Sequence, residues 1–459
     1  MKTKSQAVEI LHERTAIYTR DPVVERLLDL LPWPNGSRRL IEPSCGDGAF
    51  LLAALHRLLR DRPQLTPLEV PDLLVGYEVH PGAAEEARGR VAAALLAHGW
   101  PPPDAAGAAR RIVLTRDFLT DGPDEPCADF VAGNPPYLRY AGVPEELRAG
   151  YHAAVPAFAI RDLLHAFLER CARILRPGGE IGFVTADRWL MNEGAADLRR
   201  HLGTSLALHV AQRIDARSAF YRPKRRRAGT PPRVHPVIVR LAPPTAGSCT
   251  LTERAFFPDA GAETPSSQCL GDVASVRLAP WLGRDGIFIV DGEAASKLPA
   301  DSLVPIVDTE EVRGGALRNL TRYAIRTRPD VQPPPAVLDH LRATVHLMAP
   351  RGRRDPFWLP PETWHNWDLT KETLVVPRIT RDLHCIRVPA GVLPVNHSLS
   401  IITSGRASLD DLEHYINGPE ARRWIRARAQ GVDNGYISIT TRLLRELPIP
   451  DHVVEVDDG

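Results

Sequence analysis

Apolar runs and helical patterns alternate along the first 240 residues of the chain. Short apolar runs typical of buried strands occupy 38–43, 73–80, 111–118, 128–134, 180–186 and 235–241. Patterns with helical spacing lie between several of them, at 21–31, 51–60, 82–98 and 160–175. The last of these is followed by Pro177-Gly178-Gly179, residues that commonly end a helix. Strands joined by helical crossovers predict a doubly wound, mostly parallel α/β sheet with helices on both faces.

The regular alternation is lost after the segment APPTAGS at 242–248. Beyond it the chain carries many prolines, short β-like runs and one long helical pattern at 408–430. An aromatic cluster at 355–367 is expected to pack a small β-core, because aromatic residues in proline-rich segments do so more often than they stack on bases. We therefore predict two domains, a doubly wound domain at 1–245 and a smaller α+β domain at 246–459.

Composition narrows the class of protein without naming a function. The 459 residues include 57 Lys and Arg against 56 Asp and Glu, so any nucleic-acid surface must come from local basic patches. No stretch of 18 or more apolar residues and no signal peptide is evident, so we expect a cytoplasmic protein that does not contact a membrane. The six cysteines are far apart and lack a CxxC pair, which argues against a metal site or a disulfide framework.

A turn of small residues, Ser44-Cys45-Gly46-Asp47-Gly48, follows the first predicted strand and opens a helix. Small residues let the backbone approach a ligand, and the helix N-terminus offers free N–H groups. The turn lacks the GxGxxG pattern of dinucleotide-binding sites, which argues against NAD. Its position suits a nucleoside ligand at the carboxyl ends of the strands, although a purely structural tight turn explains it about equally well when taken alone.

The next two strands also end in polar groups. Glu78 ends the second strand, where a carboxylate could accept hydrogen bonds from ribose hydroxyls. Asp117 and Phe118 end the third strand, where they could bind an adenine amino group and cover its ring. Each feature is weak by itself, because a solvated residue at a strand end is common. Three successive strand ends of this kind favour a nucleoside site.

The most specific motif is Asn134-Pro135-Pro136-Tyr137, directly after the apolar strand at 128–134. The two prolines fix φ and remove N–H donors, so the Asn side chain and nearby backbone carbonyls remain available as acceptors. Such a turn can accept hydrogen bonds from an exocyclic amino group, and the Tyr ring can stack on the base that carries it. The motif therefore indicates chemistry on an exocyclic amine.

With these motifs in this order, the sequence resembles the gamma-class adenine-N6 DNA methyltransferases of restriction–modification systems. The resemblance adds Tyr18-Thr19 as a short upstream cofactor motif and Ala219-Phe220 as the downstream Phe motif. It is specific over about 15–245 and looser over 246–459, where the ending at 434–450 is like that of a recognition domain. It implies S-adenosylmethionine as cofactor, S-adenosylhomocysteine as product, and a base flipped out of double-stranded DNA as target.

The resemblance also implies roles for individual residues. The methionine part of the cofactor is assigned to Thr19, Glu42, Ser44 and Gly46. Its ribose is assigned to Glu78, and its adenine to Asp117 and Phe118. Neighbouring positions expected in the same cofactor site are Tyr18, Cys45, Val79 and Asn134. The target amine is assigned to Asn134 and the backbone of Pro135, within a turn that Pro136 helps to fix, and the flipped base to Tyr137 and Phe220.

Candidate DNA-contacting residues lie in two places. The link after Phe220 is longer and more basic than is usual in this family, and its Lys224, Arg225 and Arg226 suit either a solvated loop or a phosphate contact. Arg378 and Arg381 in the second domain could contact guanine or phosphate with two hydrogen bonds each.

Related activities remain as alternatives at this stage. A cytosine-C5 enzyme is excluded, because its nucleophilic Cys motif is absent and Pro126-Cys127 precedes the strand. A cytosine-N4 enzyme usually carries Ser where this chain has Asn134, so adenine is favoured. Release-factor glutamine methyltransferases lack a region like 246–459. An RNA methyltransferase and a catalytically silent SAM- or DNA-binding module stay open. No nuclease motif is evident, so we expect any cognate restriction endonuclease to be encoded separately. The resemblance to the gamma class implies a monomer.

Overall fold

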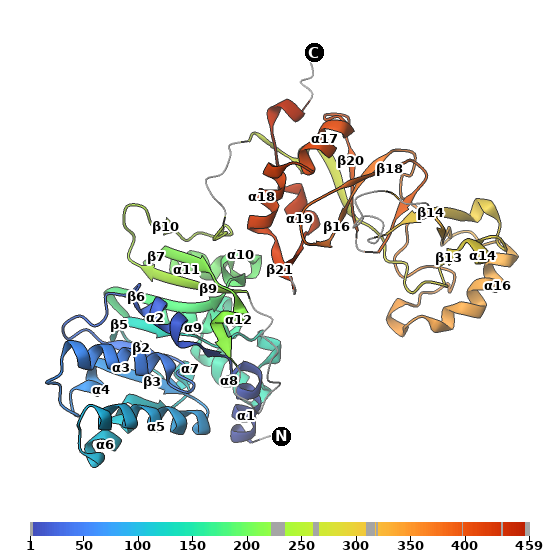
Figure 1. The fold of residues 1–459 in the computed structure, drawn as a ribbon. Helices are drawn as coiled ribbons and strands as arrows, with labels where there is room; N and C mark the ends of the chain where they lie inside the picture. Colours follow the sequence, from blue (N-terminus) through green and yellow to red (C-terminus); the bar gives the residue numbers. More distant parts are fainter. Residues whose placement is uncertain are drawn as a thin grey trace. The chain divides into compact units, whose positions relative to one another are not determined.

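The computed structural model describes residues 3–221, 235–259, 266–308, 317, 320–396, 398–432 and 435–454. The chain divides into two compact units, Met1–Asp259 and Ala260–Gly459 (Figure 1), and each is described by itself below.

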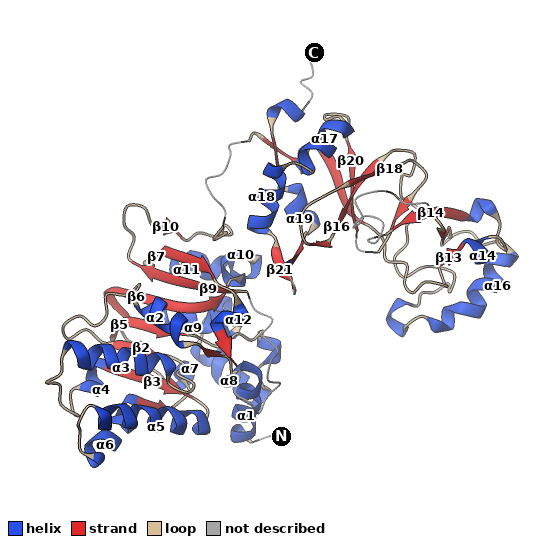
Figure 2. Ribbon diagram, in the orientation of Figure 1, coloured by secondary structure: helices blue, strands red, loops and turns tan. Residues whose placement is uncertain are grey.

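Unit 1 is built around an eight-stranded sheet (Figure 2). Its spatial order is β10-β7-β9-β6-β5-β2-β3-β4. The strands are β2 (Leu40–Glu42), β3 (Leu74–Glu78), β4 (Val113–Thr115), β5 (Ala128–Gly133), β6 (Leu175–Ala186), β7 (Ala207–Arg213), β9 (Pro236–Ala242) and β10 (Cys249–Thr250). Strands β2 to β6 pair in parallel, whereas β9, β7 and β10 add antiparallel pairs at one edge. The predicted doubly wound, mostly parallel class is confirmed.

Helices pack on this sheet in groups of neighbours. Helices α2, α3 and α5 lie side by side in one group, and α7, α9 and α11 in another. The helices of unit 1 are α1 (Lys4–Thr15), α2 (Asp21–Leu28), α3 (Ala49–Asp61), α4 (Val70–Leu73), α5 (Pro81–Ala97), α6 (Pro102–Ile112), α7 (Phe118–Asp121), α8 (Glu145–Ala154), α9 (Leu163–Arg173), α10 (Arg188–Met191), α11 (Ala196–Leu202) and α12 (Ala216–Ala219). One continuous apolar core joins these helices to the sheet.

Three boundaries in unit 1 differ from the predicted ones. Helix α9 ends at Arg173, and Pro177-Gly178-Gly179 lies inside β6, at an exposed end where the missing N–H of proline is tolerated. The start of the predicted strand at 111–118 is the last turn of α6. Strand β7 has no counterpart among the predicted elements, because its outer half is polar and partly exposed. It lies near the antiparallel edge of the sheet, where one face can meet water.

The predicted domain boundary after residue 245 falls too early. Strand β10 pairs with β7, with Cys249 opposite Leu208. The buried guanidinium of Arg199 donates hydrogen bonds to the carbonyls of Glu253 and Arg254 at 2.6 and 3.0 Å. These contacts hold the chain in unit 1 as far as Asp259.

Unit 2 contains two four-stranded sheets, each with its own apolar core. The first, in the order β12-β20-β16-β18, packs against α13, α17, α18 and α19. Its elements are β12 (Ala274–Leu278), β16 (Thr373–Pro377), β18 (Ile386–Val388), β20 (Ser398–Thr403), α13 (Leu270–Val273), α17 (Leu409–Ile416), α18 (Pro419–Arg428) and α19 (Thr441–Arg445). The single helix predicted at 408–430 is two helices, because Gly418 and Pro419 end one and start the next.

The second sheet of unit 2 has the order β13-β15-β14-β19. Its elements are β13 (Ile289–Asp291), β14 (Leu303–Val307), β15 (Arg322–Ile325), β19 (Leu393–Pro394), α14 (Gly292–Ala295) and α16 (Pro335–Thr344). Trp364 is buried in its core, and Phe357, Trp358 and Trp367 pack against that core. The packing role predicted for the aromatic cluster is thus confirmed. A smaller pairing joins β11 (Gln268–Cys269) to β23 (Pro448–Ile449). A three-stranded sheet has β22 (Tyr436–Ser438) between β17 (Ile379–Thr380) and β21 (Gln430–Val432).

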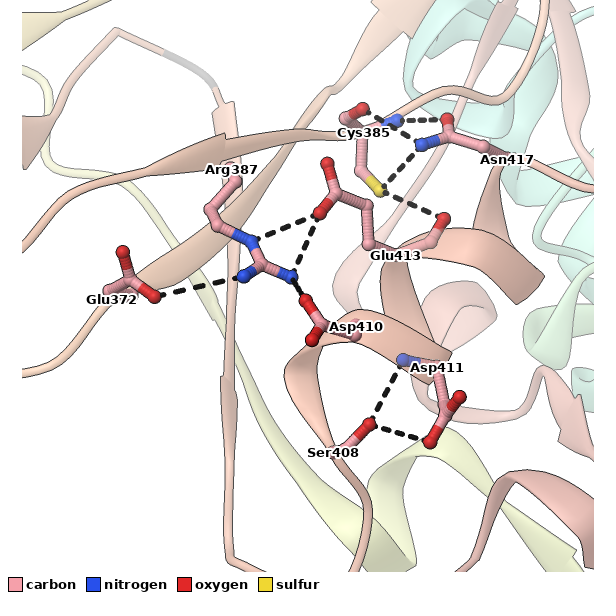
Figure 3. A network of polar contacts seen from close by, with 8 residues as sticks. All are labelled: Glu372, Cys385, Arg387, Ser408, Asp410, Asp411, Glu413 and Asn417. Atoms are coloured by element: carbon pink, nitrogen blue, oxygen red, sulfur yellow. Dashed lines mark hydrogen bonds and ion pairs between the residues drawn. The ribbon is translucent and has the colours of Figure 1, made fainter.

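A polar network ties β18 to α17 in unit 2 (Figure 3). The guanidinium of Arg387 contacts the carboxylates of Glu413, at 3.0 Å, and of Asp410. Asn417 holds the backbone of Cys385 through its side-chain amide, at 2.9 Å for the bond from the Cys385 N–H. Arg387 is therefore neutralised within the unit and has a structural role.

Among the described helices, none combines the length and the apolar character that a membrane span requires.

Candidate functional site

An open cavity lies at the carboxyl ends of the parallel strands of unit 1. Parallel strands place the residues that follow them along one edge, and four polar residues at successive strand ends reach this cavity. Every residue predicted for the cofactor site lines it: Tyr18, Thr19, Glu42, Ser44, Cys45, Gly46, Glu78, Val79, Asp117, Phe118 and Asn134. The structure therefore brings together residues from five separate segments of the chain.

The turn after β2 is fixed by a glycine and a carboxylate. Gly46 has φ +54°, and a Cβ there would lie 2.8 Å from the ring of Tyr18, so only glycine fits. The N–H of Gly46 donates to Oε2 of Glu78 at 2.9 Å. The second oxygen of Glu78 accepts the N–H of His80 at 2.8 Å. The turn and the end of β3 thus form one rigid wall of the cavity.

The cavity is acidic, and two of its polar atoms have no hydrogen-bond partner among the residues that the structure describes. Glu42 is 1% exposed, and burial raises the pKa of its carboxyl well above the usual value, with the nearby Asp47 raising it further. Oε2 of Glu42 and Oγ1 of Thr19 are both buried without a hydrogen-bond partner. Burial also raises the pKa of Glu78 and of Asp117. Unpaired buried acceptors are costly, so this wall suits a ligand that carries positive charge and N–H donors.

The opposite end of the cavity is aromatic. Asp117 caps α7 through the N–H of Leu119 at 3.0 Å and accepts the hydroxyl of Tyr151 at 2.8 Å, which fixes its carboxylate. The rings of Phe118 and Phe167 stack with centroids 5.7 Å apart. Tyr151, Leu163 and Phe167 also line this end. The sequence analysis missed these three residues, because they lie on α8 and α9 and no local motif marks them.

Asn134 stands at the edge of the cavity in a fixed orientation. Its side-chain amide donates to the carbonyl of Ile17 at 3.0 Å, and its Oδ1 accepts the hydroxyl of Tyr137. That hydroxyl also lies 2.8 Å from the carbonyl oxygen of Val184 on β6. Pro136 lines the cavity together with Asn134. The Pro-Pro turn and these bonds hold the Asn oxygen beside the acidic wall.

The upstream and downstream motifs meet in a two-stranded pairing. Strand β1 (Tyr18–Thr19) pairs with β8 (Phe220–Tyr221), with Thr19 opposite Phe220. The rings of Tyr137 and Phe220 lie 6.4 Å apart at an interplanar angle of 59°. Both side chains are buried, and neither lines the cavity. The two rings predicted to hold the flipped base therefore lie near one another, and in this structure they are tilted and not parallel.

Comparison with known proteins agrees with this geometry. Residues 119–220 match the model of the Eco57I restriction-modification methylase family. The chain is 28% identical to the Type II methyltransferase M.XhoI of Xanthomonas vasicola, over 95% of this chain and 91% of the relative. It is 26% identical to M.PaeR7I of Pseudomonas aeruginosa, over 96% and 86%. The chain is a relative of the restriction–modification methyltransferases.

The fold of this chain has a counterpart among solved structures. It aligns with the Type IIL restriction-modification enzyme MmeI, solved in complex with DNA, with a TM-score of 0.59 and 14% identity. The alignment covers 96% of this chain and 65% of MmeI, so the chain spans about two thirds of that longer protein. This likeness supports the class I methyltransferase fold, and the relatives support S-adenosylmethionine as cofactor. The acidic wall fits the sulfonium and ammonium charges of that molecule.

One residue that the sequence analysis did not single out, Tyr221, contacts the turn after β2. The hydroxyl of Tyr221 donates to the carboxylate of Asp47, which Arg90 contacts at 2.7 Å. The pairing of β1 with β8 thus connects to the turn after β2. No local signal marks Tyr221, because its partner is far away in the sequence.

The candidate DNA-contacting residues fall in two groups. Lys224, Arg225 and Arg226 lie outside the described residues. Arg378 and Arg381 belong to unit 2, on either side of β17. Arg378 is half-buried, whereas Arg381 is exposed, with its guanidinium 5.3 Å from the ring centroid of Tyr436 on β22. Arg381 therefore presents a cation supported by an aromatic ring.

Proposed function

We propose that this methyltransferase transfers the methyl group of S-adenosylmethionine to N6 of an adenine flipped out of a short sequence in duplex DNA. The observation that carries the proposal is the position of Asn134 at the edge of the cavity that all the predicted cofactor residues line. An amine acceptor and a methyl-donor site on one rigid edge suit direct transfer between them.

The cofactor site follows from the two ends of the cavity. Thr19, Glu42, Ser44 and Gly46 hold the charged methionine part, where the unpaired oxygens of Thr19 and Glu42 need donors. Glu78 accepts bonds from the ribose hydroxyls. Asp117 and Phe118 hold the adenine at the aromatic end. When bound there, the cofactor supplies an activated methyl group.

The target amine is held by two acceptors. Oδ1 of Asn134 has two lone pairs, so it can accept an N–H of the base while it keeps the bond from Tyr137. The carbonyl of Pro135 takes the other N–H. Held this way, the nitrogen would be pyramidal, with its lone pair free to take the methyl group that the bound cofactor would supply, and S-adenosylhomocysteine would be the product released. The amine then loses a proton to solvent, and positioning and electrostatics supply most of the rate enhancement.

Unit 2 supplies target recognition in this proposal. Arg378 and Arg381 contact DNA in this proposal. Arg381 is exposed and its guanidinium lies over the ring of Tyr436, and Arg378 directly follows the end of β16, on the other side of β17. Arg387, by contrast, is paired with the carboxylates of the network in Figure 3. Substitution of Arg387 is therefore expected to leave DNA affinity unchanged. The enzyme acts as a monomer, and a cognate endonuclease is encoded separately.

Methylome sequencing tests the activity directly. The protein and its Asn134→Ala variant are expressed in a bacterial host that lacks DNA methylation, and the modified bases are mapped. We expect N6-methyladenine at one short motif with the wild type only. Methylcytosine modified at N4 would retain the enzyme class and overturn the choice of base, and unmodified DNA would contradict the proposal.

Glu42→Gln is expected to stabilise the ligand-free protein and to lower its affinity for the cofactor. The substitution keeps the shape of the side chain and removes a buried carboxylate whose Oε2 has no partner. We expect the free energy of unfolding without ligand to rise by about 1 kcal/mol, and the affinity for S-adenosylmethionine to fall at least about tenfold. Calorimetric titration and denaturant unfolding measure the two effects.

The same variant tests a pH dependence of stability. The pKa of Glu42 is higher in the folded protein than in the unfolded chain. The contribution of this carboxyl to folding stability is therefore fully present at pH below its pKa in the unfolded chain, and it is lost as the pH rises through its pKa in the folded protein. The Glu42→Gln variant should lack this loss. Glu86→Gln, on the exposed side of α5, is the matched control. Unchanged cofactor affinity in the Glu42→Gln variant would contradict the role given to Glu42.

A further inference from the structure

Helix α1 forms one wall of the cofactor cavity, although no motif predicted a role for it. Leu11, His12 and Thr15 line the cavity from this helix. Ala7 and Val8, one to two turns earlier, are buried in the core of unit 1. The helix also begins with a capping box at Thr3. His12 therefore projects from a packed helix, and its position in the cavity wall is fixed.

His12 lies flat against a second histidine whose two ring nitrogens are both used. The rings of His12 and His80 stack with centroids 3.8 Å apart and an interplanar angle of 5°. Nδ1 of His80 accepts the N–H of Ala83 at 3.1 Å, which caps α5. Nε2 of His80 lies 2.7 Å from a carboxylate oxygen of Glu9. Because Nδ1 is the acceptor, Nε2 carries the proton and donates to Glu9.

The same histidine is joined to the residue proposed to bind the ribose. The backbone N–H of His80 donates to one oxygen of Glu78 at 2.8 Å, and the other oxygen of Glu78 accepts the N–H of Gly46. A continuous set of contacts therefore runs from Glu9 on α1 through His80 to the carboxylate at the end of β3. His12 stacks on the middle of this set, so its ring lies at the ribose end of the cavity.

We infer that His12 is a further cofactor-binding residue, which contacts the ribose hydroxyls from the wall of the cavity that α1 forms. His80 and Glu9 act through it as positioning residues, because they fix the ring plane on which His12 stacks. The inference rests on the proposed function, since it takes the nucleoside end of the cofactor to lie at Glu78. It extends the ribose site from one strand end to an N-terminal helix.

The test compares two ligands on four proteins. S-adenosylhomocysteine and its analogue without the two ribose hydroxyls are titrated into the wild type and into His12→Phe, Glu9→Gln and Glu86→Gln. Phenylalanine keeps a flat ring for stacking on His80 and removes both ring nitrogens. Glutamine at position 9 keeps an acceptor for His80 and removes the charge. Glu86→Gln changes an exposed residue of α5 that does not line the cavity.

We expect His12→Phe to lower the affinity for S-adenosylhomocysteine about tenfold, mainly through faster dissociation. The affinity for the analogue without the ribose hydroxyls should stay nearly unchanged. Glu9→Gln should give a smaller loss with the same selectivity, and Glu86→Gln none. A purely structural role would weaken both ligands equally, and that result would overturn the inference, as would unchanged affinity in both variants. If the wild type binds neither ligand, the proposed function fails as well, so the two failures are distinguishable.

Discussion

Asn134→Ala is expected to lower the rate of methyl transfer about 100- to 1,000-fold while leaving cofactor affinity within about threefold of the wild type. Alanine removes the oxygen proposed to hold the target amine in the transition state. The cofactor contacts proposed for Glu42, Glu78 and Asp117 come from other strand ends and stay in place. Single-turnover methylation of a DNA duplex and titration with S-adenosylhomocysteine measure the two quantities separately.

Two further variants make this prediction specific. Asn134→Ser keeps a shorter acceptor and should retain part of the activity. Tyr137→Phe removes the hydroxyl that joins Asn134 to the carbonyl of Val184, so it should lower the rate by a smaller factor through loss of orientation. An Asn134→Ala enzyme with full single-turnover rate would eliminate the assigned role, whatever the other two variants do.

Arg199→Leu is expected to destabilise unit 1 by about 3–5 kcal/mol. Arg199 is 1% exposed, and burial lowers its pKa. Its guanidinium donates to four backbone carbonyls, those of Trp189 and Asn192 at 2.8 Å each, and those of Glu253 and Arg254 at 2.6 and 3.0 Å. Leucine would remove this donor from all four carbonyls, of which that of Trp189 is in a buried hydrogen bond and the other three are in partly buried ones. The midpoint of thermal unfolding should fall by about 10 °C for a unit of this size.

The neighbouring residue provides the control for this prediction. Arg200 has the same chemistry, and its side chain is 56% exposed, paired only with Asp197 and Glu253 at the surface. Arg200→Leu should change the free energy of unfolding by less than about 1 kcal/mol. If Arg199→Leu were as mild as Arg200→Leu, the buried guanidinium would not be what attaches residues 249–259 to unit 1.

The central residues of the candidate site could be predicted because the sequence patterns that mark them are local. Glu42, Glu78 and Asn134 each come directly after or at the end of a short apolar strand, and Asp117 follows another. Parallel strands bring their carboxyl ends to one edge, so the order of strands along the chain already implies a shared cavity. The prolines of the Asn134 turn act on their own neighbours, and their effect needs no distant partner.

Other element boundaries depended on contacts with neighbouring strands, which the local sequence pattern does not contain. Pro177-Gly178-Gly179 is a common helix stop, yet β6 continues through it because the segment lies at an exposed strand end. Strand β7 has too few apolar positions to be identified alone, and it is stabilised by its antiparallel partners β9 and β10. In both cases the neighbour in the sheet decided the structure of the segment.

The sequence by itself determined the doubly wound class, the residues at the strand ends that line the cavity and the turn that carries Asn134. These features follow from hydrophobic periodicity and from residues that act within a few positions of one another. Only the tertiary structure decided the pairing of Thr19 with Phe220, the aromatic end built by Tyr151 and Phe167, the place of His12 in the cavity wall and the attachment of residues 249–259 to unit 1. Each of these joins segments far apart in the chain, and such contacts depend on how whole elements pack, which no local pattern encodes.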